Sequence, residues 1–216
     1  MRKITINLAA VAAFCIVVAS PALVSSSCAT PKTEQEDTTI IREDSGITAL
    51  KYSSPEVPAS IEFCGKTIDL SRFDRHERMD RELLAFTYMH STSLQMLKKA
   101  NRYFPIVEPI LKENGIPDDF KYLMVIESNM NPTARSSAGA AGLWQFMQGT
   151  GRDYGLEVNN NVDERYHIEK ATRAACRYLK DAYAKYKDWV AVAASYNAGQ
   201  ARIASQLAKQ DVDDSL

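Results

Sequence analysis

Apolar side chains recur along most of this chain at the spacing of buried helix faces. Leucine, tyrosine and alanine return every three to four positions through residues 81–102, which predicts one helix with a single buried face. That face comprises Leu83, Leu84, Tyr88, Leu94, Leu97 and Ala100. Pro105 should begin a second helix, because proline fits a first helical turn, and Gly115 should end it. Further helices are expected over residues 117–127, 143–154, 168–187, 189–196 and 200–209.

Strand patterns are nearly absent by comparison. Residues 61–70 contain two short apolar runs around a glycine, so we expect an extended segment that packs on the domain. The predicted fold class is therefore all-α.

The first 60 residues have a different character. Two basic residues, a short apolar stretch and a group of small residues predict a secretory signal peptide over residues 1–27, and the apolar stretch is shorter than the roughly 20 residues that span a bilayer. Residues 28–60 are polar and predict a flexible linker, which leaves 61–216 as the folded domain. Cys28 follows a segment that faintly resembles a lipoprotein cleavage site, so the exported protein is either free in the periplasm or attached to a membrane, such as the outer membrane, through Cys28.

Charge and cysteine usage narrow the class of partner. The chain carries 26 basic and 27 acidic residues, without the concentrated basic face that nucleic acid requires. No cysteine or histidine pair has metal-ligand spacing, so we expect no metal and no cofactor. Cys64 and Cys176 could pair in an oxidising compartment, but Cys176 lies in an apolar helical pattern that favours a buried thiol.

Glu127 is the residue most suggestive of catalysis. It ends an almost wholly apolar run, where loss of water disfavours the ionised carboxyl and keeps a proton available near neutral pH. The alternative is a glutamate at a helix end that faces solvent or pairs with Lys121 or Arg135. Position alone does not decide between these readings.

Three segments around and after Glu127 carry a resemblance to a known family. They are Glu127-Ser128 with Asn131-Pro132 and Ser136, then residues 139–147 (Gly-Ala-Ala-Gly-Leu-Trp-Gln-Phe-Met), then residues 194–199 (Ala-Ser-Tyr-Asn-Ala-Gly). In this order and spacing they resemble the soluble-lytic-transglycosylase family, which has a goose-type-lysozyme-like helical domain and cleaves peptidoglycan glycan strands. The resemblance covers roughly residues 63–202.

This resemblance implies a reaction that needs only one carboxyl group. Glu127 would protonate the oxygen between N-acetylmuramic acid and N-acetylglucosamine, and then accept the proton of the muramic acid C6 hydroxyl as that hydroxyl attacks C1. Conventional glycosidases need a second carboxylate, and none lies near Glu127 in sequence. Asp163 and Glu164 belong to a stretch that is typical of a helix start and of salt bridges.

The resemblance also implies substrate-binding roles for Ser136, Gln145, Met147, Tyr196 and Asn197. Gln145, on the helix after the glycine-rich loop, would donate and accept hydrogen bonds to sugar groups, and Met147 would line the cleft. Tyr196 and Asn197 would face the acid, with the tyrosine hydroxyl orienting it or the substrate acetamido group.

Some features leave alternatives open. Trp144 is either core packing or a sugar platform, and Ser128 should set the loop after the catalytic helix. The sequence stops at Leu216, before a segment with which such domains usually complete the cleft, so we expect a catalytic domain truncated at its C-terminus. A hydrolytic muramidase and a non-catalytic peptidoglycan-binding protein are the competing functions.

Overall fold

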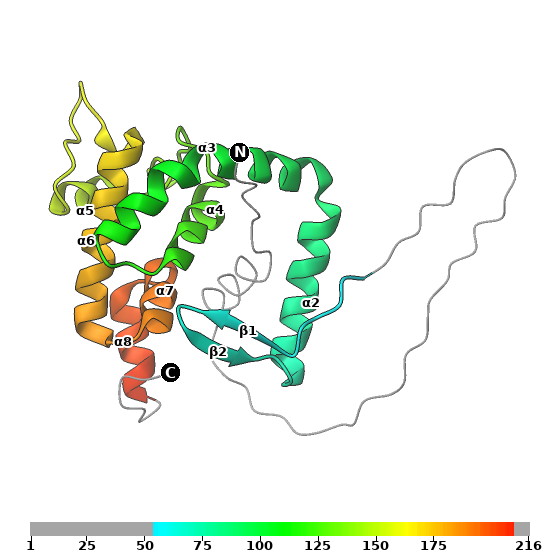
Figure 1. The fold of residues 1–216 in the computed structure, drawn as a ribbon. Coiled ribbons are helices and arrows are strands. Elements are labelled where there is room, and N and C mark those ends of the chain that lie inside the picture. Colours follow the sequence, from blue (N-terminus) through cyan, green and yellow to red (C-terminus); the bar gives the residue numbers. More distant parts are fainter. Residues whose placement is uncertain (1–53, 210–216) are drawn as a thin grey trace, which may run out of the picture.

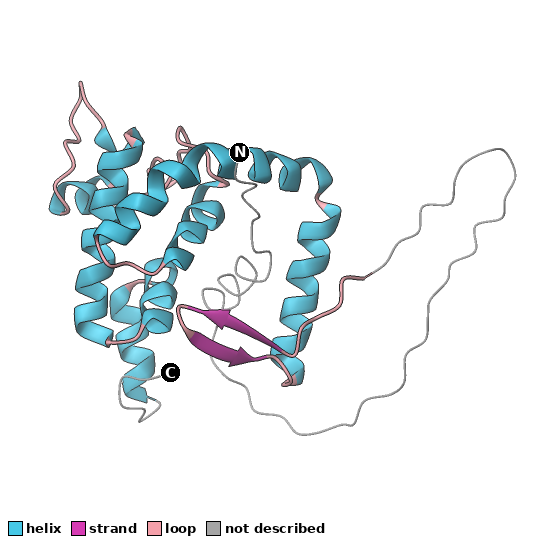
Figure 2. Ribbon diagram, in the orientation of Figure 1, coloured by secondary structure: helices cyan, strands magenta, loops and turns pink. Residues whose placement is uncertain are grey.

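The computed structural model describes residues 54–209, which form a helical domain with one small hairpin (Figures 1 and 2). The predicted signal peptide, Cys28 and most of the predicted linker lie outside the described residues. Within residues 54–209, no helix combines the length and the apolar character that crossing a bilayer requires.

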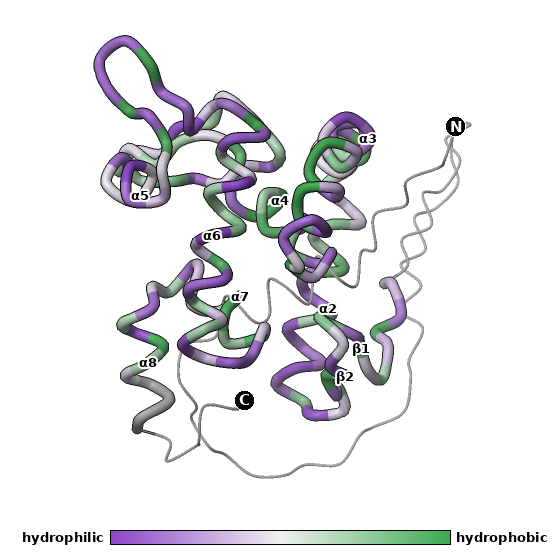
Figure 3. The backbone as a smooth tube through the Cα atoms, turned by 60° about the vertical axis from the view of Figure 1, so that its left-hand side comes forward, coloured by the Kyte–Doolittle hydropathy of each residue, from purple (hydrophilic) through white to green (hydrophobic). Residues whose placement is uncertain are grey.

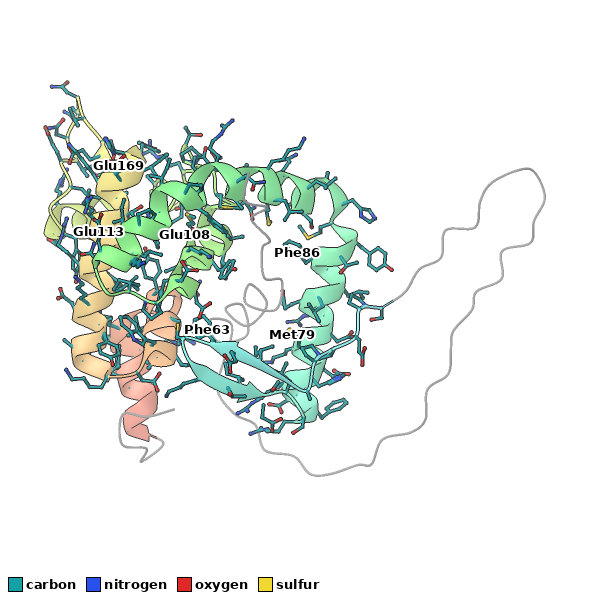
Figure 4. All side chains as sticks on the ribbon, in the orientation of Figure 1. Phe63, Met79, Phe86, Glu108, Glu113 and Glu169 are labelled. Atoms are coloured by element: carbon teal, nitrogen blue, oxygen red, sulfur yellow. The ribbon has the colours of Figure 1, made fainter. Side chains whose placement is uncertain are left out.

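The extended segment predicted near residue 61 is an antiparallel hairpin of β1 (Ser60–Phe63) and β2 (Lys66–Asp69), with Ile61 opposite Ile68. Cys64 and Gly65 form its turn, and both have positive φ, as tight hairpin turns require. Phe63 lies at this end of the hairpin (Figure 4). Its side chain is fully buried, and its ring centroid lies 6.3 Å from that of Phe120.

The long helix predicted over residues 81–102 is wrong in its bounds. The structure has α2 (Phe73–Tyr88) and α3 (His90–Glu113), which meet at an angle at Met89 (Figure 1). Because the helix direction changes there, the predicted single face is divided. Leu83 and Ala100 are buried, whereas Leu84, Leu94 and Leu97 are exposed.

Pro105 does not begin a helix, because it and Pro109 lie inside α3. Both prolines are exposed, so the carbonyl groups that lose their backbone donors lie on the solvent side of the helix. The opposite face buries a continuous apolar stripe that packs against later helices and offsets the lost hydrogen bonds. The members of that stripe are Met96, Ala100, Tyr103, Phe104, Val107, Ile110 and Leu111.

Gly115, with φ 68°, ends α3 as predicted. The chain then forms the 3₁₀ helix η1 (Asp118–Tyr122) and the short helix α4 (Leu123–Ser128), which ends at Asn129 in the left-handed conformation. Leu123, Met124 and Val125 are buried, in agreement with the largely hydrophobic colouring of α4 in Figure 3.

The helix predicted over residues 143–154 is only partly present. Helix α5 spans Gln148–Asp153, while residues 142–145 form turns, because Gly142 and Gln145 both have positive φ. An isolated bridge pairs Ala141 with Phe146 and closes this segment into a tight loop.

The last elements match their predictions closely. After the 3₁₀ helix η2 (Glu164–Tyr166) come α6 (Ile168–Tyr186), α7 (Trp189–Ala198) and α8 (Gln200–Lys209). Asp163 accepts a hydrogen bond at the start of η2 and pairs with Arg165, so its predicted structural role is confirmed. Cys176 is a buried free thiol on α6, and Cys64 is also free.

Candidate active site

Glu127 lies in the last turn of α4, half-buried at the edge of the core. Burial raises the pKa of its carboxyl group to about 7, and a hydrogen bond from the Asn197 side chain opposes that rise. Lys121, which the sequence offered as a partner of Glu127, pairs with Glu108 and Asp118. Among the described residues no ion pair holds Glu127, so its carboxyl group can exchange a proton near neutral pH.

The helix that carries Glu127 is fastened to the glycine-rich loop by Ser128. Its Oγ lies 2.9 Å from the Met124 carbonyl oxygen and 3.0 Å from the Leu143 carbonyl oxygen. The first contact ties the side chain to its own helix and the second ties that helix to the loop. This is the role that the sequence predicted for Ser128.

Tyr196 fastens the same loop from α7. Its hydroxyl donates a 2.8 Å hydrogen bond to the Trp144 carbonyl oxygen. The pKa of this hydroxyl is well above its usual value, first because of burial and then because of the Glu127 charge, so the two groups are close. The proton of Tyr196 is thus directed to the loop, whereas the family resemblance implied that it would be directed to the acid or the substrate.

Gln145 lies between these fastening points in the left-handed conformation, with φ 48°, and not on a helix as predicted. Its Nε2 donates to the Gly142 carbonyl oxygen at 2.8 Å and contacts the Ala134 carbonyl oxygen at 3.3 Å. Because the amide nitrogen is used by the loop, the side-chain oxygen is the group left to contact a ligand. The sequence predicted that Gln145 would both donate hydrogen bonds to a sugar and accept them from it. In the structure only the accepting role is left to its side chain.

Ser136 and Met147 occupy the two limbs of this loop. Ser136 is exposed, and its Oγ accepts a 3.0 Å hydrogen bond from the Ala140 backbone N–H, which leaves its own hydroxyl proton available. Met147 precedes α5 with 46% of its surface exposed, so it is not core filler. Both residues belong to the loop that Ser128 and Tyr196 hold against the helix of Glu127.

Trp144 is core packing, the first of its two predicted alternatives. It is fully buried, and its indole N–H donates a 3.0 Å hydrogen bond to Thr172 Oγ1 on α6. Thr172 Oγ1 in turn donates to the Ile168 carbonyl oxygen at 2.7 Å. The loop is therefore anchored in the core by one large side chain.

Among residues 54–209, no group of three or more histidine, cysteine or acidic residues could hold a metal ion.

The structure brings Glu127, Asn197, Tyr196 and the Gln145 loop to one place through α4, α7 and residues 134–147. Sequence reasoning missed Arg165, whose buried guanidinium contacts the same loop. The Asp-Glu-Arg pattern at residues 163–165 was the available signal, but it gave no indication of burial.

Comparison of the sequence with known proteins identifies the family of this chain. The Transglycosylase SLT domain family matches residues 105–215, slightly more than half of the chain, and this stretch includes every residue described above at the site. The chain belongs to this family. The expected all-α, lysozyme-like lytic transglycosylase domain is confirmed, with the β1–β2 hairpin added to it.

Individual relatives give the same result. Membrane-bound lytic murein transglycosylase D of Escherichia coli strain K12 is 31% identical over 128 residues, which are 59% of this chain and 27% of that protein. The peptidoglycan transglycosylase gp16 of Escherichia phage T7 is 33% identical over 93 residues, which are 42% of this chain and 7% of that protein. The SLT chain thus spans about a quarter of the length of the first relative and far less of the second.

Proposed function

We propose that this SLT-family chain is a peptidoglycan lytic transglycosylase in which Glu127 is the single general acid and base. The observation that carries the proposal is the Glu127 carboxyl group, whose pKa is raised to about 7 by burial while Asn197 hydrogen-bonds it. A group that must first give and later take a proton works best when its pKa is close to the working pH. The names of the matched relatives, a lytic murein transglycosylase and a peptidoglycan transglycosylase, support the same substrate.

In the first half of the reaction, protonated Glu127 gives its proton to the bridging oxygen between N-acetylmuramic acid and N-acetylglucosamine. The bond from C1 to that oxygen breaks with both electrons leaving on the oxygen, and positive charge develops at C1. Glu127 is then a carboxylate, and the hydrogen bond from Asn197 favours this charged form.

In the second half, the C6 hydroxyl of the same muramic acid forms a bond to C1 and gives its proton to Glu127. The products are a free N-acetylglucosamine end and a 1,6-anhydro end, with no water consumed. The acid is regenerated in its starting form, so a single carboxyl group is sufficient for the cycle.

The loop at residues 134–147 supplies the contacts that hold the glycan. The free hydroxyl proton of Ser136 and the free side-chain oxygen of Gln145 are a donor and an acceptor for sugar and acetamido groups. Met147 offers an exposed apolar surface to a sugar ring. Tyr196 holds the loop in a fixed position relative to Glu127 through its hydrogen bond to Trp144.

Product analysis distinguishes this proposal from a hydrolytic muramidase. Purified peptidoglycan is digested in water labelled with oxygen-18, and the muramic acid ends are analysed by mass spectrometry. The proposal expects unlabelled anhydro ends, whereas labelled reducing ends would establish hydrolysis. A chain that binds the strands without releasing either product would be a peptidoglycan-binding protein.

The same proposal includes the organisation of the whole chain. We infer a signal peptide at residues 1–27, a linker at 28–60 and a catalytic domain from residue 61, with the protein exported to the cell envelope and a lipid attached at Cys28. Fractionation of cells that express the chain and its Cys28→Ser variant tests this. Loss of the variant from the membrane fraction is expected, and an unchanged distribution would contradict the anchor.

A further inference from the structure

Arg165 is the most deeply buried charged side chain of the described residues, with 1% of its surface exposed against 4% for Asp188. Its Nε and Nη2 donate to the two carboxylate oxygens of Asp163, at 2.9 and 2.6 Å. Its Nη1 donates to the carbonyl oxygens of Gly139 and Phe146, at 2.8 and 2.9 Å. A charge this deep is tolerated only because a carboxylate and these carbonyls satisfy it.

The two carbonyls belong to opposite limbs of the loop at the proposed site. Gly139 lies on the limb that carries Ser136, and the backbone N–H of Gly139 bonds the Ser136 carbonyl oxygen at 3.0 Å. Phe146 lies between Gln145 and Met147 on the other limb. A single planar guanidinium therefore fixes the separation between two limbs of the loop. One limb carries Ser136, which would donate to the glycan, and the other carries Gln145, which would accept from it, and Met147, which would pack on it.

Three contacts to backbone carbonyls show how the second limb is held. Ser128 contacts the carbonyl of Leu143, Tyr196 bonds that of Trp144, and Arg165 bonds that of Phe146. The first two come from the elements that carry Glu127 and Asn197, whereas Arg165 comes from a third element, η2.

Two glycines lie close against Arg165. A Cβ at Gly142 would lie 1.9 Å from the Arg165 carbonyl oxygen, and a Cβ at Gly151 would lie 3.3 Å from its Cγ. Both glycines thus allow the loop and α5 to close on this residue.

We propose that Arg165 is a positioning residue for glycan binding, which sets the spacing of the Ser136 limb and the Gln145–Met147 limb without touching the substrate. This inference rests on the proposed function for its substrate. This role differs from a role in folding alone, because Arg165 acts on substrate affinity. The contacts that hold Glu127 do not involve Arg165.

The experiment uses the full chain and its Arg165→Ala, Arg165→Lys and Arg173→Ala variants. Arg173 is the matched control, because it is an exposed arginine of α6 whose partner is Glu113, away from the loop. Thermal unfolding first identifies conditions in which every variant is folded. Steady-state cleavage of soluble glycan strands is then measured over a range of pH, with and without added ethylguanidinium or ethylammonium.

Arg165→Ala should raise KM about tenfold or more, since small displacements of binding groups are costly, with the pH dependence of kcat unchanged. Arg165→Lys should behave similarly, because an ammonium group cannot reproduce the planar set of donors. Ethylguanidinium should restore KM in Arg165→Ala, ethylammonium should not, and Arg173→Ala should match the parent.

A parental KM in Arg165→Ala, or rescue by both cations alike, would overturn the inference. If the parent releases no product, the proposed function fails, and amide hydrogen exchange decides the positioning role. Faster exchange confined to residues 134–147 in Arg165→Ala, reversed by ethylguanidinium, would still support that role. Unchanged exchange there would refute it.

Discussion

Asn197 on α7 hydrogen-bonds the carboxyl group of Glu127 on α4, and its effect on the pKa of that group is opposite to the larger effect of burial. Replacing Asn197 with alanine should therefore raise the Glu127 pKa further. Because the reaction begins with protonated Glu127, activity falls as pH rises through this pKa.

The fall in kcat/KM on the alkaline side should accordingly move to higher pH in Asn197→Ala, while substrate affinity also decreases. A pH profile measured beside Asn160→Ala, a change in an exposed loop, checks this. An alkaline side that stays in place or moves to lower pH would contradict the contact as described.

The raised pKa of Glu127 also predicts a pH-dependent stability. The folded-state pKa is about 7 and the ordinary value is 4.5, so the folded protein holds this proton more tightly than the unfolded chain does. Stability contributed by this group is present below pH 4.5 and is lost as the pH rises through 7.

Glu127→Gln carries no such penalty. Its free energy of unfolding should exceed that of the parent at pH 8 by on the order of 3 kcal/mol at most, and the excess should shrink at pH 4.5. Urea denaturation at the two pH values measures the difference. An equal difference at both would show that Glu127 is not desolvated in the folded state.

Gly142 is required for the close approach of the loop to η2. It has φ 80°, and a Cβ there would lie 1.9 Å from the Arg165 carbonyl oxygen. Gly139 is a matched control, because its φ is 90° and a Cβ there meets nothing within 4 Å. Gly139→Ala should cost about 1–2 kcal/mol of stability from backbone strain alone.

Gly142→Ala should cost clearly more, because the backbone of η2 must also move. It should lower kcat/KM as well, since Gln145 is displaced with the loop. Thermal unfolding and cleavage assays of both variants test this, and equal losses would mean that the close approach is unimportant.

Thr172 satisfies the indole N–H of Trp144 in the core. Thr172→Val keeps the side-chain shape but leaves that buried donor unpaired, which should lower the free energy of unfolding by about 1–3 kcal/mol. Thr172→Ser retains the hydroxyl and should lose less. If valine and serine were equally destabilising, the methyl group and not the hydrogen bond would matter at this position.

The sequence predicted helices well where local signals agreed. The amphipathic run of α6 ends at Lys187 in the left-handed conformation, and α8 begins directly after Gly199, which has φ 84°. The break at Met89 carried no such signal, since no glycine or proline lies there. At Pro105 the packing of the apolar face of α3 outweighed a local rule that favours a helix start.

The site itself depended on contacts between segments far apart in sequence. Spacing alone indicated a desolvated Glu127, but only the resemblance to the family placed Asn197 and Tyr196 near it. The left-handed conformation of Gln145 was not predictable, because glutamine has no special preference for it and the surrounding loop imposes it. Arg165 was missed for a similar reason, because nothing local distinguishes a buried arginine from an exposed one.

Turnover by Glu127→Gln tests the central claim most directly. The amide has nearly the shape of the carboxyl group but can neither give nor take the proton, so release of anhydro ends from purified peptidoglycan should fall by roughly a thousandfold or more. Binding of the same strands, measured in parallel, should be retained. Anhydro ends released at the parental rate by a folded Glu127→Gln variant would contradict the account.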